Sequence, residues 1–472
     1  MPLRAKITNP AVGGDRTVIE PPQSWRIVKE QPGDEPDDVI FETKYGVRTI
    51  ELNRPKKLNS LNGSMARKII ARLKEWEKSQ LATAVIIKGA GRAFCAGGDV
   101  AALAKWDAEG PEGQQRSADY FALEYKLDHL IASYEKPYIA FIDGITMGGG
   151  VGLSTHAPFR IATENTVFAM PETTIGFFPD VGASFFLPRM DGQMGTYLAL
   201  TSEQMKGVDV FYHGIATHYI HSSTLPDLEA RLAELTFKDY LSLQERHAVI
   251  NSTIEEFCTG LPAPRANISG ALRRAVDTCF APSNRTPPAV LSALKNAEQN
   301  GETDEIKTWA KKTIATINER SPTSVAVTLR QLHTSRAWNI AQTFQHEHNI
   351  AARFMAHPDF VTGVTARLVD RIKTRPAWKP NTLAEVTDAE VNSFFDKEPK
   401  MELLNNNELA TYTEYPHAWI GLPREGEIAQ MMKDQPNAQK AEVVKFFVDR
   451  SRGKQGVKEK VEEVYDRVAE TK

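Results

Sequence analysis

Cysteine is scarce in this sequence of 472 residues, and the chain has neither a strong net charge nor a long apolar run. Its three cysteines, Cys95, Cys258 and Cys279, lie far apart and have no metal-like spacing. They favour a reducing compartment over a disulfide framework. The net charge of −3 gives no broad electrostatic reason to bind nucleic acid. No apolar run approaches the roughly 20 residues of a membrane span, so we expect no membrane insertion.

Neither end of the sequence is typical of a targeting signal. Residues 1–25 mix basic with acidic side chains, which is typical neither of a secretory signal nor of an acid-free transit peptide. The last three residues, Glu470-Thr471-Lys472, do not form a peroxisomal signal. The location of the protein must therefore be inferred from other features.

Strand and helix signals divide the chain into an α/β part and a helical part. The length favours two or three folding units. Up to about residue 190 the pattern is β-β-α-β-loop-α-β-Gly loop-α-β-β, and from about 195 to 373 it is mostly helical. Trp378-Lys379-Pro380 marks a break, and residues 381–472 are polar and helix-prone. Strands are expected over 39–53 (a hairpin around Tyr45-Gly46), 84–87, 138–142, 159–162 and 166–170, and helices from Asn62 or Ser64, from near Asp99 and from about Gln115.

The first glycine-rich motif, Ala93–Asp99, follows a predicted buried strand. Its Gly97-Gly98 pair leaves a backbone N–H free to approach a ligand, because glycine adds no side chain. Asp99 stands where it can cap the following helix. Taken alone, such a segment is more often a tight turn with an N-cap than a binding loop.

The second glycine-rich motif, Ile145–Gly152, also follows a predicted buried strand. It lacks the Gly-Lys-Ser/Thr ending of a nucleotide-binding loop, so we do not expect a nucleotide site here. A single glycine run is weak and is also typical of a tightly packed turn. Two such loops, each exposing an N–H group, can together form an oxyanion hole.

Two acids, Glu172 and Asp180, follow among apolar and turn residues. If they are buried, their pKa values rise, which suits general acid–base work. Taken singly, each acid is more often a helix cap or a surface turn residue.

Together with Leu52–Leu61, these motifs resemble the signature of the crotonase (enoyl-CoA hydratase/isomerase) superfamily in order and spacing. The resemblance covers about residues 38 to 370. It implies an α/β crotonase fold, a spiral of ββα units with a helical C-terminal region, that binds acyl-CoA thioesters. The residues implied by position are the oxyanion donors Gly98 and Gly149 and the CoA-binding residues Lys56, Leu58 and Ala96. The implied organisation is an N-terminal extension over 1–37, the crotonase core over 38–300, its helical C-terminal part over 301–380, and a C-terminal extension over 381–472.

The position two residues past the glycine triplet distinguishes members of this superfamily. Its hydratases carry there the first of two glutamates that add water across a double bond, whereas this sequence has Gly152. The second glutamate corresponds to Glu172. Because each group of an acid–base pair contributes about 10²–10⁴-fold in rate, hydratase and isomerase activities are disfavoured.

The segments 144–154, 168–173 and 176–182 resemble the 3-hydroxyisobutyryl-CoA hydrolases, which cleave a thioester in valine breakdown. The resemblance implies that Glu172 is the catalytic carboxylate, either as a general base or as a nucleophile that forms a mixed anhydride. It implies that Asp180 lies beside the 3-hydroxyl of the acyl group, and that Glu124 and Gly149 also bind substrate. It further implies a mitochondrial location and an acyl-CoA partner, with no cofactor and no metal, and it is compatible with a homo-oligomer.

A second hypothesis makes the chain a component of the small subunit of the mitochondrial ribosome, because some fungal relatives of the hydrolase are ribosomal subunits. Nine basic residues between Lys440 and Lys472 permit contact with such an assembly, through which alone we expect nucleic acid to be a partner. Seven acids in the same stretch favour a solvated helix of mixed charge instead. Both roles are compatible, since the predicted catalytic acids are intact.

Overall fold

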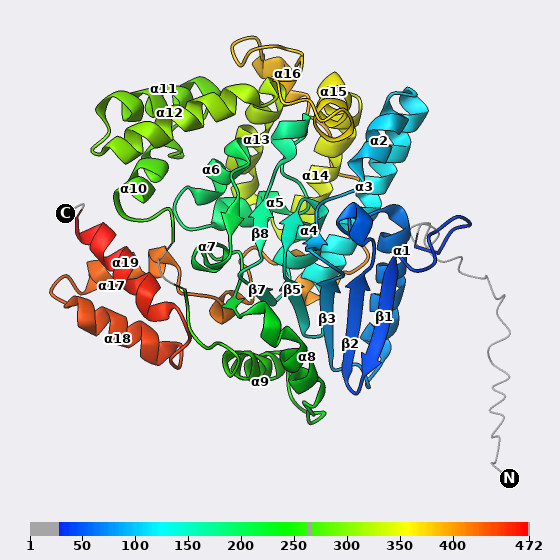
Figure 1. The fold of residues 1–472 in the computed structure, drawn as a ribbon, viewed down its shortest axis with the longest axis vertical. Coiled ribbons are helices and arrows are strands. Elements are labelled where there is room, and N and C mark those ends of the chain that lie inside the picture. The colour runs from blue at the N-terminus through cyan, green and yellow to red at the C-terminus, as the bar shows by residue number, and fades with distance from the viewer. Residues whose placement is uncertain (1–27, 263–265, 471–472) are drawn as a thin grey trace, which may run out of the picture.

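The computed structural model describes residues 28–262 and 266–470, and their strands form two sheets (Figure 1). Within these residues, six strands form a sheet in the order β1-β2-β3-β5-β7-β10, in which the β1–β2 pair is antiparallel and the other pairs are parallel. The other described strands form a sheet in the order β4-β6-β8-β9, which ends in the antiparallel pair β8–β9. The bounds are β1 Val39–Lys44, β2 Val47–Leu52, β3 Ala84–Gly89, β4 Ala93–Cys95, β5 Tyr138–Ile142, β6 Ile145–Met147, β7 Phe159–Ala162, β8 Val167–Ala169, β9 Met205–Lys206 and β10 His218–Tyr219.

The predicted hairpin around Tyr45-Gly46 is confirmed. β1 and β2 pair along their full lengths, and Tyr45 takes a left-handed φ of 50° at the turn. A side chain at Gly46 would overlap that of Thr83, so this turn requires glycine. β5 and β7 are short apolar runs that are buried throughout, as expected for parallel strands covered on both faces.

Helices make up most of the remaining structure. The α-helices of the first half are α1 Gly63–Lys78, α2 Val100–Asp107, α3 Pro111–Ala132, α4 Gly149–Thr155, α5 Ala183–Phe186, α6 Met194–Thr201, α7 Val208–Tyr212, α8 Leu225–Ala233 and α9 Leu243–Glu255. Those of the second half are α10 Gly270–Cys279, α11 Pro287–Asn300, α12 Asp304–Glu319, α13 Pro322–Thr334, α14 Ile340–Met355, α15 Pro358–Val364, α16 Asp388–Asn392, α17 Glu425–Asp434, α18 Lys440–Arg450 and α19 Val457–Ala469.

The start of α1 confirms one of its two predicted caps. The Asn62 side chain accepts a hydrogen bond of 2.8 Å from Met65 N, which satisfies one of the unpaired N–H groups at the helix start. The apolar residues at helical spacing are buried in the core. They are Met65, Ile69, Ile70, Leu73 and Trp76.

The predicted cap at Asp99 is wrong. Asp99 occupies the N-cap position of α2, but its side chain makes no capping hydrogen bond. It accepts instead from Arg54 Nη2 and Lys57 Nζ, each at 3.1 Å. Bonds to charged donors are stronger than a bond to a neutral backbone N–H group. Asp99 therefore links the Ala93–Asp99 motif to the segment around Arg54.

The sequence patterns did not predict β4, β6, β9 or β10. Each has only two or three residues, which is too short for an alternation of apolar and polar side chains to be visible. β4 and β6 nevertheless matter for the site, because they pair in parallel immediately before the two glycine-rich loops.

The predicted C-terminal extension 381–472 folds back onto the body of the chain. Figure 1 shows α17, α18 and α19 together in orange to red, with α19 next to α10. Apolar residues of this segment, such as Val443, Phe447 and Val461, belong to the same buried cluster as the first helices of the core. The predicted N-terminal extension 1–37 lies mostly outside the described residues. In the described part of the chain, no helix has the length and apolar character that crossing a membrane requires.

Candidate active site

The two glycine-rich loops meet because the strands that precede them pair. β4 leads to Gly97-Gly98, and β6 leads to Gly148-Gly149. A Cβ atom added at Gly149 would lie 3.4 Å from Gly98 N. The structure therefore brings together the two predicted oxyanion donors.

Neither donor N–H group is bonded to a backbone carbonyl within the described residues. Gly149 is the first residue of α4, so its N–H has no partner inside the helix. Beside Gly98, Leu61 N donates to Gly97 O and Asp99 N donates to Leu61 O, each at 2.8 Å, and these bonds do not use Gly98 N–H. Two adjacent donors of this kind can stabilise a developing oxyanion.

Two buried glutamates border this donor pair. Glu172 begins the short 3-10 helix η3, Glu172–Ile175, and Glu124 lies in the middle of α3. A Cβ atom at Gly148 would lie 3.2 Å from Glu172 Oε1, and one at Gly149 would overlap Glu124 Oε1. Glycine at these two positions is what allows the carboxyl groups to approach the donors.

Asp180 lies in a turn that α14 holds in place. Val181 and Gly182 have left-handed φ values of 54° and 86°, and that conformation is rare for a β-branched residue. The carboxylate of Glu347 accepts from Gly182 N at 2.7 Å and from Ser184 N at 2.9 Å. These bonds compensate for the unfavourable backbone and fix the position of Asp180.

Burial raises the pKa of every acid in this cluster. Together with the nearby Asp180, it raises the pKa values of Glu172 and Glu124 well above their usual range. It raises the pKa of Asp180 to about 7, although the hydrogen bond that Tyr125 donates to Asp180 Oδ2 at 2.7 Å opposes the rise. Because neighbouring acids in a desolvated site cannot all ionise, the cluster holds protons near neutral pH.

A fourth acid, Asp128, occupies the space beside Gly152. Asp128 lies one turn after Glu124 on α3, is fully buried, and has no hydrogen-bond partner for either carboxyl oxygen within the described residues. A Cβ atom at Gly152 would lie 2.5 Å from Asp128 Oδ2. A glutamate at position 152 therefore does not fit without moving Asp128.

The predicted CoA-binding residues share one segment next to the first glycine loop. Ala96 N donates to Leu58 O at 3.0 Å, which places both residues beside Gly97. Lys56 is exposed on the 3-10 helix η2, Pro55–Lys57. Their binding of CoA stays a prediction.

Asn59 organises this segment, and we did not predict its role. Its buried side chain accepts from Arg54 N at 2.8 Å and donates to Ala90 O at 2.9 Å and to Ala93 O at 2.8 Å. Its φ of 56° is left-handed, a conformation that asparagine tolerates better than most residues. An asparagine in the middle of Leu52–Leu61 was the available signal.

Three further residues of the site were missed as well: Tyr125, Asp128 and Glu347. Asp128 carried a local signal, because it follows Glu124 by four residues and therefore shares its helix face. Tyr125 and Glu347 carried none, since they act on Asp180 and its turn across 55 and 165 residues of sequence. Within the described ranges, no group of three or more His, Cys, Asp or Glu residues is placed to hold a metal ion.

Known proteins resemble this chain in sequence and in structure. A family model described as "Enoyl-CoA hydratase/isomerase" matches residues 47–395. The chain is 52% identical to "Small ribosomal subunit protein mS47" of Neurospora crassa, in an alignment that covers 99% of this chain and 92% of that protein. It is 41% identical to "3-hydroxyisobutyryl-CoA hydrolase, mitochondrial" of Gallus gallus, covering 79% of this chain and 90% of that protein. The crystal structure of a carnitinyl-CoA dehydratase from Mycobacterium thermoresistibile has a TM-score of 0.66 at 31% identity, covering 77% of this chain and 97% of that one.

Proposed function

The chain belongs to the enoyl-CoA hydratase/isomerase (crotonase) family, and from that premise we propose that it hydrolyses 3-hydroxyisobutyryl-CoA to the free hydroxy acid and CoA. The predicted family and the predicted α/β fold class are confirmed. One observation carries the proposal: Glu172 adjoins the Gly98–Gly149 donor pair, whereas the position of the other hydratase glutamate is Gly152, beside Asp128. The site thus keeps the groups for acyl transfer and lacks one needed for hydration.

The donor pair supplies the first part of the chemistry. Attack on the thioester carbonyl places negative charge on its oxygen, and the N–H groups of Gly98 and Gly149 can meet that charge without reorganising. Since such donors act more strongly where water is excluded, the burial of the surrounding acids favours this role.

Glu172 is the proposed catalytic carboxylate. In its ionised form, with the protons of the cluster on the neighbouring acids, it acts on water as a general base, or it attacks the carbonyl itself and forms a mixed anhydride that water then opens. In the first route water adds to the carbonyl carbon while its proton passes to Glu172. The carbon–sulfur bond then breaks, and that proton passes to the departing thiolate, so the products are the acid and CoA.

Asp180 is proposed to orient the 3-hydroxyl group of the substrate. Tyr125 donates to Asp180 Oδ2, and Oδ1 is the oxygen proposed to meet the substrate. Because burial raises the pKa of Asp180 to about 7, this group exchanges a proton near neutral pH and can either donate to or accept from a hydroxyl. Glu124, whose Oε1 lies beside Gly149, is proposed as a further substrate-site residue.

A thioesterase assay tests this proposal. We expect the purified chain to release CoA from 3-hydroxyisobutyryl-CoA, followed with a thiol reagent, and Glu172→Gln to reduce the rate by about 10²–10⁴-fold. The matched control is Glu112→Gln, which changes an exposed acid at the start of α3 and should leave the rate unaltered. Absence of CoA release, or undiminished release by Glu172→Gln, would contradict the proposal. Rapid hydration of crotonyl-CoA would do so as well.

A second function is favoured by the full-length similarity. The relative "Small ribosomal subunit protein mS47" aligns with 99% of this chain, so the alignment includes nearly all of residues 381–472. We propose that the chain is also a component of the small subunit of the mitochondrial ribosome, with the C-terminal segment as part of its contact surface. The predicted mitochondrial location is confirmed by the relatives.

Co-sedimentation tests this second role. We expect the tagged full-length chain to migrate with small ribosomal subunits through a sucrose gradient at moderate salt, and Glu172→Gln to migrate with them equally well. If the chain stays at the top of the gradient under conditions where known subunits sediment, the ribosomal proposal is wrong and the hydrolase proposal is unaffected.

A further inference from the structure

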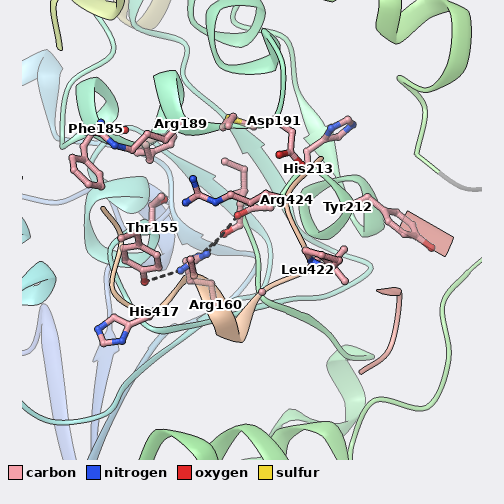
Figure 2. Close-up of a pocket in the computed structure, with 18 of the residues that line it drawn as sticks. Thr155, Arg160, Phe185, Arg189, Asp191, Tyr212, His213, His417, Leu422 and Arg424 are labelled. Atoms are coloured by element: carbon pink, nitrogen blue, oxygen red, sulfur yellow. Dashed lines mark hydrogen bonds between the residues drawn. The ribbon is translucent and has the colours of Figure 1, made fainter. Parts of the chain in front are cut away.

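A cavity lies where the C-terminal segment packs on the core, at the far end of α4 from the oxyanion donors. Thr155 and His156 at the end of this helix line it (Figure 2). A helix of seven residues spans about 10 Å, so the cavity and Gly149 lie at opposite ends of α4. On its inner side, His156 of the lining is hydrogen-bonded to Val181 O, next to Asp180, at 2.8 Å. Its enclosed volume is about 120 Å³, and it opens to solvent at its mouth.

Two parts of the chain that are distant in sequence form the walls. One wall comes from residues 155–160, 185–191 and 212–215 of the core, and the other comes from residues 415–424 and Lys460 of the C-terminal segment. Figure 2 shows side chains from both walls around a common hollow. The cavity therefore exists only because the C-terminal segment is docked.

The lining carries a strong excess of positive charge. Four cationic side chains line it, Arg160, Arg189, Arg424 and Lys460, against one carboxylate, Asp191. That carboxylate is paired with Lys460 at 2.9 Å. In the described part of the chain, the three arginines form no ion pair with a carboxylate, so their charge is not neutralised by the protein.

Arg160 and Arg189 are held by neutral acceptors. Because a carbonyl or hydroxyl oxygen fixes a guanidinium plane without cancelling its charge, both groups are preorganised for an anion. The acceptors are Ala157 O, Gly214 O, Ile215 O and Tyr415 Oη for Arg160, and Phe185 O, Trp338 O and Thr413 O for Arg189.

Arg424 has a different environment. It stands at the N-cap of α17 and is partly buried, and its guanidinium makes no hydrogen bond with the described residues. Burial lowers the pKa of Arg189, and the charge of Arg424 lowers it further, with Glu414 opposing. Like charges that face one cavity repel each other, and an anion between them removes that repulsion.

We propose that this cavity binds a small organic phosphate. The Arg424 guanidinium can present two N–H groups to the oxygens of a phosphate, and Arg160 and Arg189 add positive charge to the same lining. Phe186, Met190 and Leu422 provide apolar surface for the body of the ligand. The ligand joins core to C-terminal segment, because Arg189 belongs to one wall and Arg424 to the other.

Calorimetric titration of the full chain tests this proposal, with adenosine 5′-monophosphate and inorganic phosphate as probes and uncharged adenosine as the control compound. We expect saturable binding of the monophosphate and weaker binding of inorganic phosphate, with no binding of adenosine. Arg424→Gln should weaken binding about tenfold, the size of one charge-assisted hydrogen bond. Arg424→Lys keeps the positive charge but loses the paired N–H groups of the guanidinium. Its affinity for the monophosphate should lie between that of the unaltered chain and that of Arg424→Gln.

The matched control is Arg452→Gln, which alters an exposed arginine of the same C-terminal segment outside the cavity. It should leave the affinity unchanged. Equal heats for the monophosphate and adenosine would overturn the proposal, as would full affinity in Arg424→Gln. Binding of a short RNA without binding of either phosphate probe would also overturn it and would make this surface a nucleic-acid contact. Thioesterase activity is measured on the same variants and should not change, since Arg424 is not one of the residues proposed to act on the thioester.

Discussion

Two buried clusters of charged side chains in this chain undergo the same desolvation but titrate in opposite directions. In the acid cluster around Asp180, carboxyl groups face one another, and burial raises the pKa of Asp180 to about 7. Around Glu425, burial acts in the same sense, but Lys460, Arg273 and Arg467 lower the pKa of Glu425 to about 2. Burial therefore sets the raised pKa of Asp180, whereas the cations around Glu425 reverse the effect of burial there.

The two clusters also differ in how completely their polar atoms are satisfied. Glu425 receives two hydrogen bonds from Arg273, at 2.7 and 2.9 Å, and fastens α17 to α10. In the acid cluster, by contrast, oxygens of Glu124, Asp128 and Glu172 have no partner within the described residues. Unpartnered buried oxygens cost free energy, so their grouping beside two free N–H donors is typical of a functional site rather than of a structural one.

The linked pH dependences of stability have opposite signs. The stabilisation from Glu425 is lost as the pH falls from its usual pKa of 4.5 towards about 2. The native state holds a proton on Asp180 that the unfolded state releases near 3.8, so this group lowers stability as the pH rises from there to about 7.

Breaking the paired cluster should have the largest effect on stability. Glu425→Gln removes the anion that faces three cations, and we expect the free energy of unfolding to fall by about 3–5 kcal/mol in urea titrations at pH 7. The control is Glu427→Gln on the same helix, whose exposed carboxylate pairs with Arg450 at 2.7 Å, and it should cost less than about 1 kcal/mol. If both variants lost the same free energy of unfolding, the buried ion pairs of Glu425 would contribute no more to stability than the surface pair of Glu427.

Filling the space beside Asp128 should have the next largest effect. Gly152→Ala would normally stabilise a helix by about 1 kcal/mol, but here the added methyl group meets Asp128 and should cost about 1–3 kcal/mol. The double variant with Asp128→Ala should recover part of that loss. Additive effects of the two changes in urea unfolding would mean that the two positions are not in contact.

Removing one charge from the acid cluster should stabilise the protein. We expect Asp180→Asn to raise the free energy of unfolding at pH 8 by at least about 1 kcal/mol, because each unit of pKa shift corresponds to about 1.4 kcal/mol. The gain should shrink as the pH falls towards 4, where the native carboxyl is already neutral. Unfolding at pH 5 and pH 8 measures it, and the thioesterase rate should fall in the same variant. A gain that is independent of pH would contradict the assignment of this proton to Asp180.

The smallest effect is expected from Tyr125→Phe. It removes the hydrogen bond that lowers the pKa of Asp180. The pH range over which stability falls should therefore extend above 7. The free energy of unfolding should also decrease by about 1 kcal/mol, because one hydrogen bond is lost. Tyr134→Phe on the neighbouring stretch of chain provides the control, because its hydroxyl donates to Leu73 O and not to an acid. If the free energy of unfolding depended on pH identically in the two variants, Tyr125 would have no influence on the pKa of Asp180.

Much of the site could be predicted because its parts are local. Gly98, Gly149, Glu172 and Asp180 each lie in a short motif whose order along the chain is informative. The structure brings the first three together through the pairing of β4 with β6 and through η3. Strands of three residues leave no periodic signal, so that pairing was invisible in the sequence even though its consequence was predicted.

The sequence by itself determined the strand–loop–helix order, the glycine positions that admit no side chain and the lack of a glutamate at position 152. Only the tertiary structure decided which groups surround them: Asp128 against Gly152, Tyr125 on Asp180, and the arginines around the cavity at the far end of α4. The physical reason is that backbone geometry is set by local sequence, whereas the protonation and charge of a buried group depend on neighbours that distant segments supply.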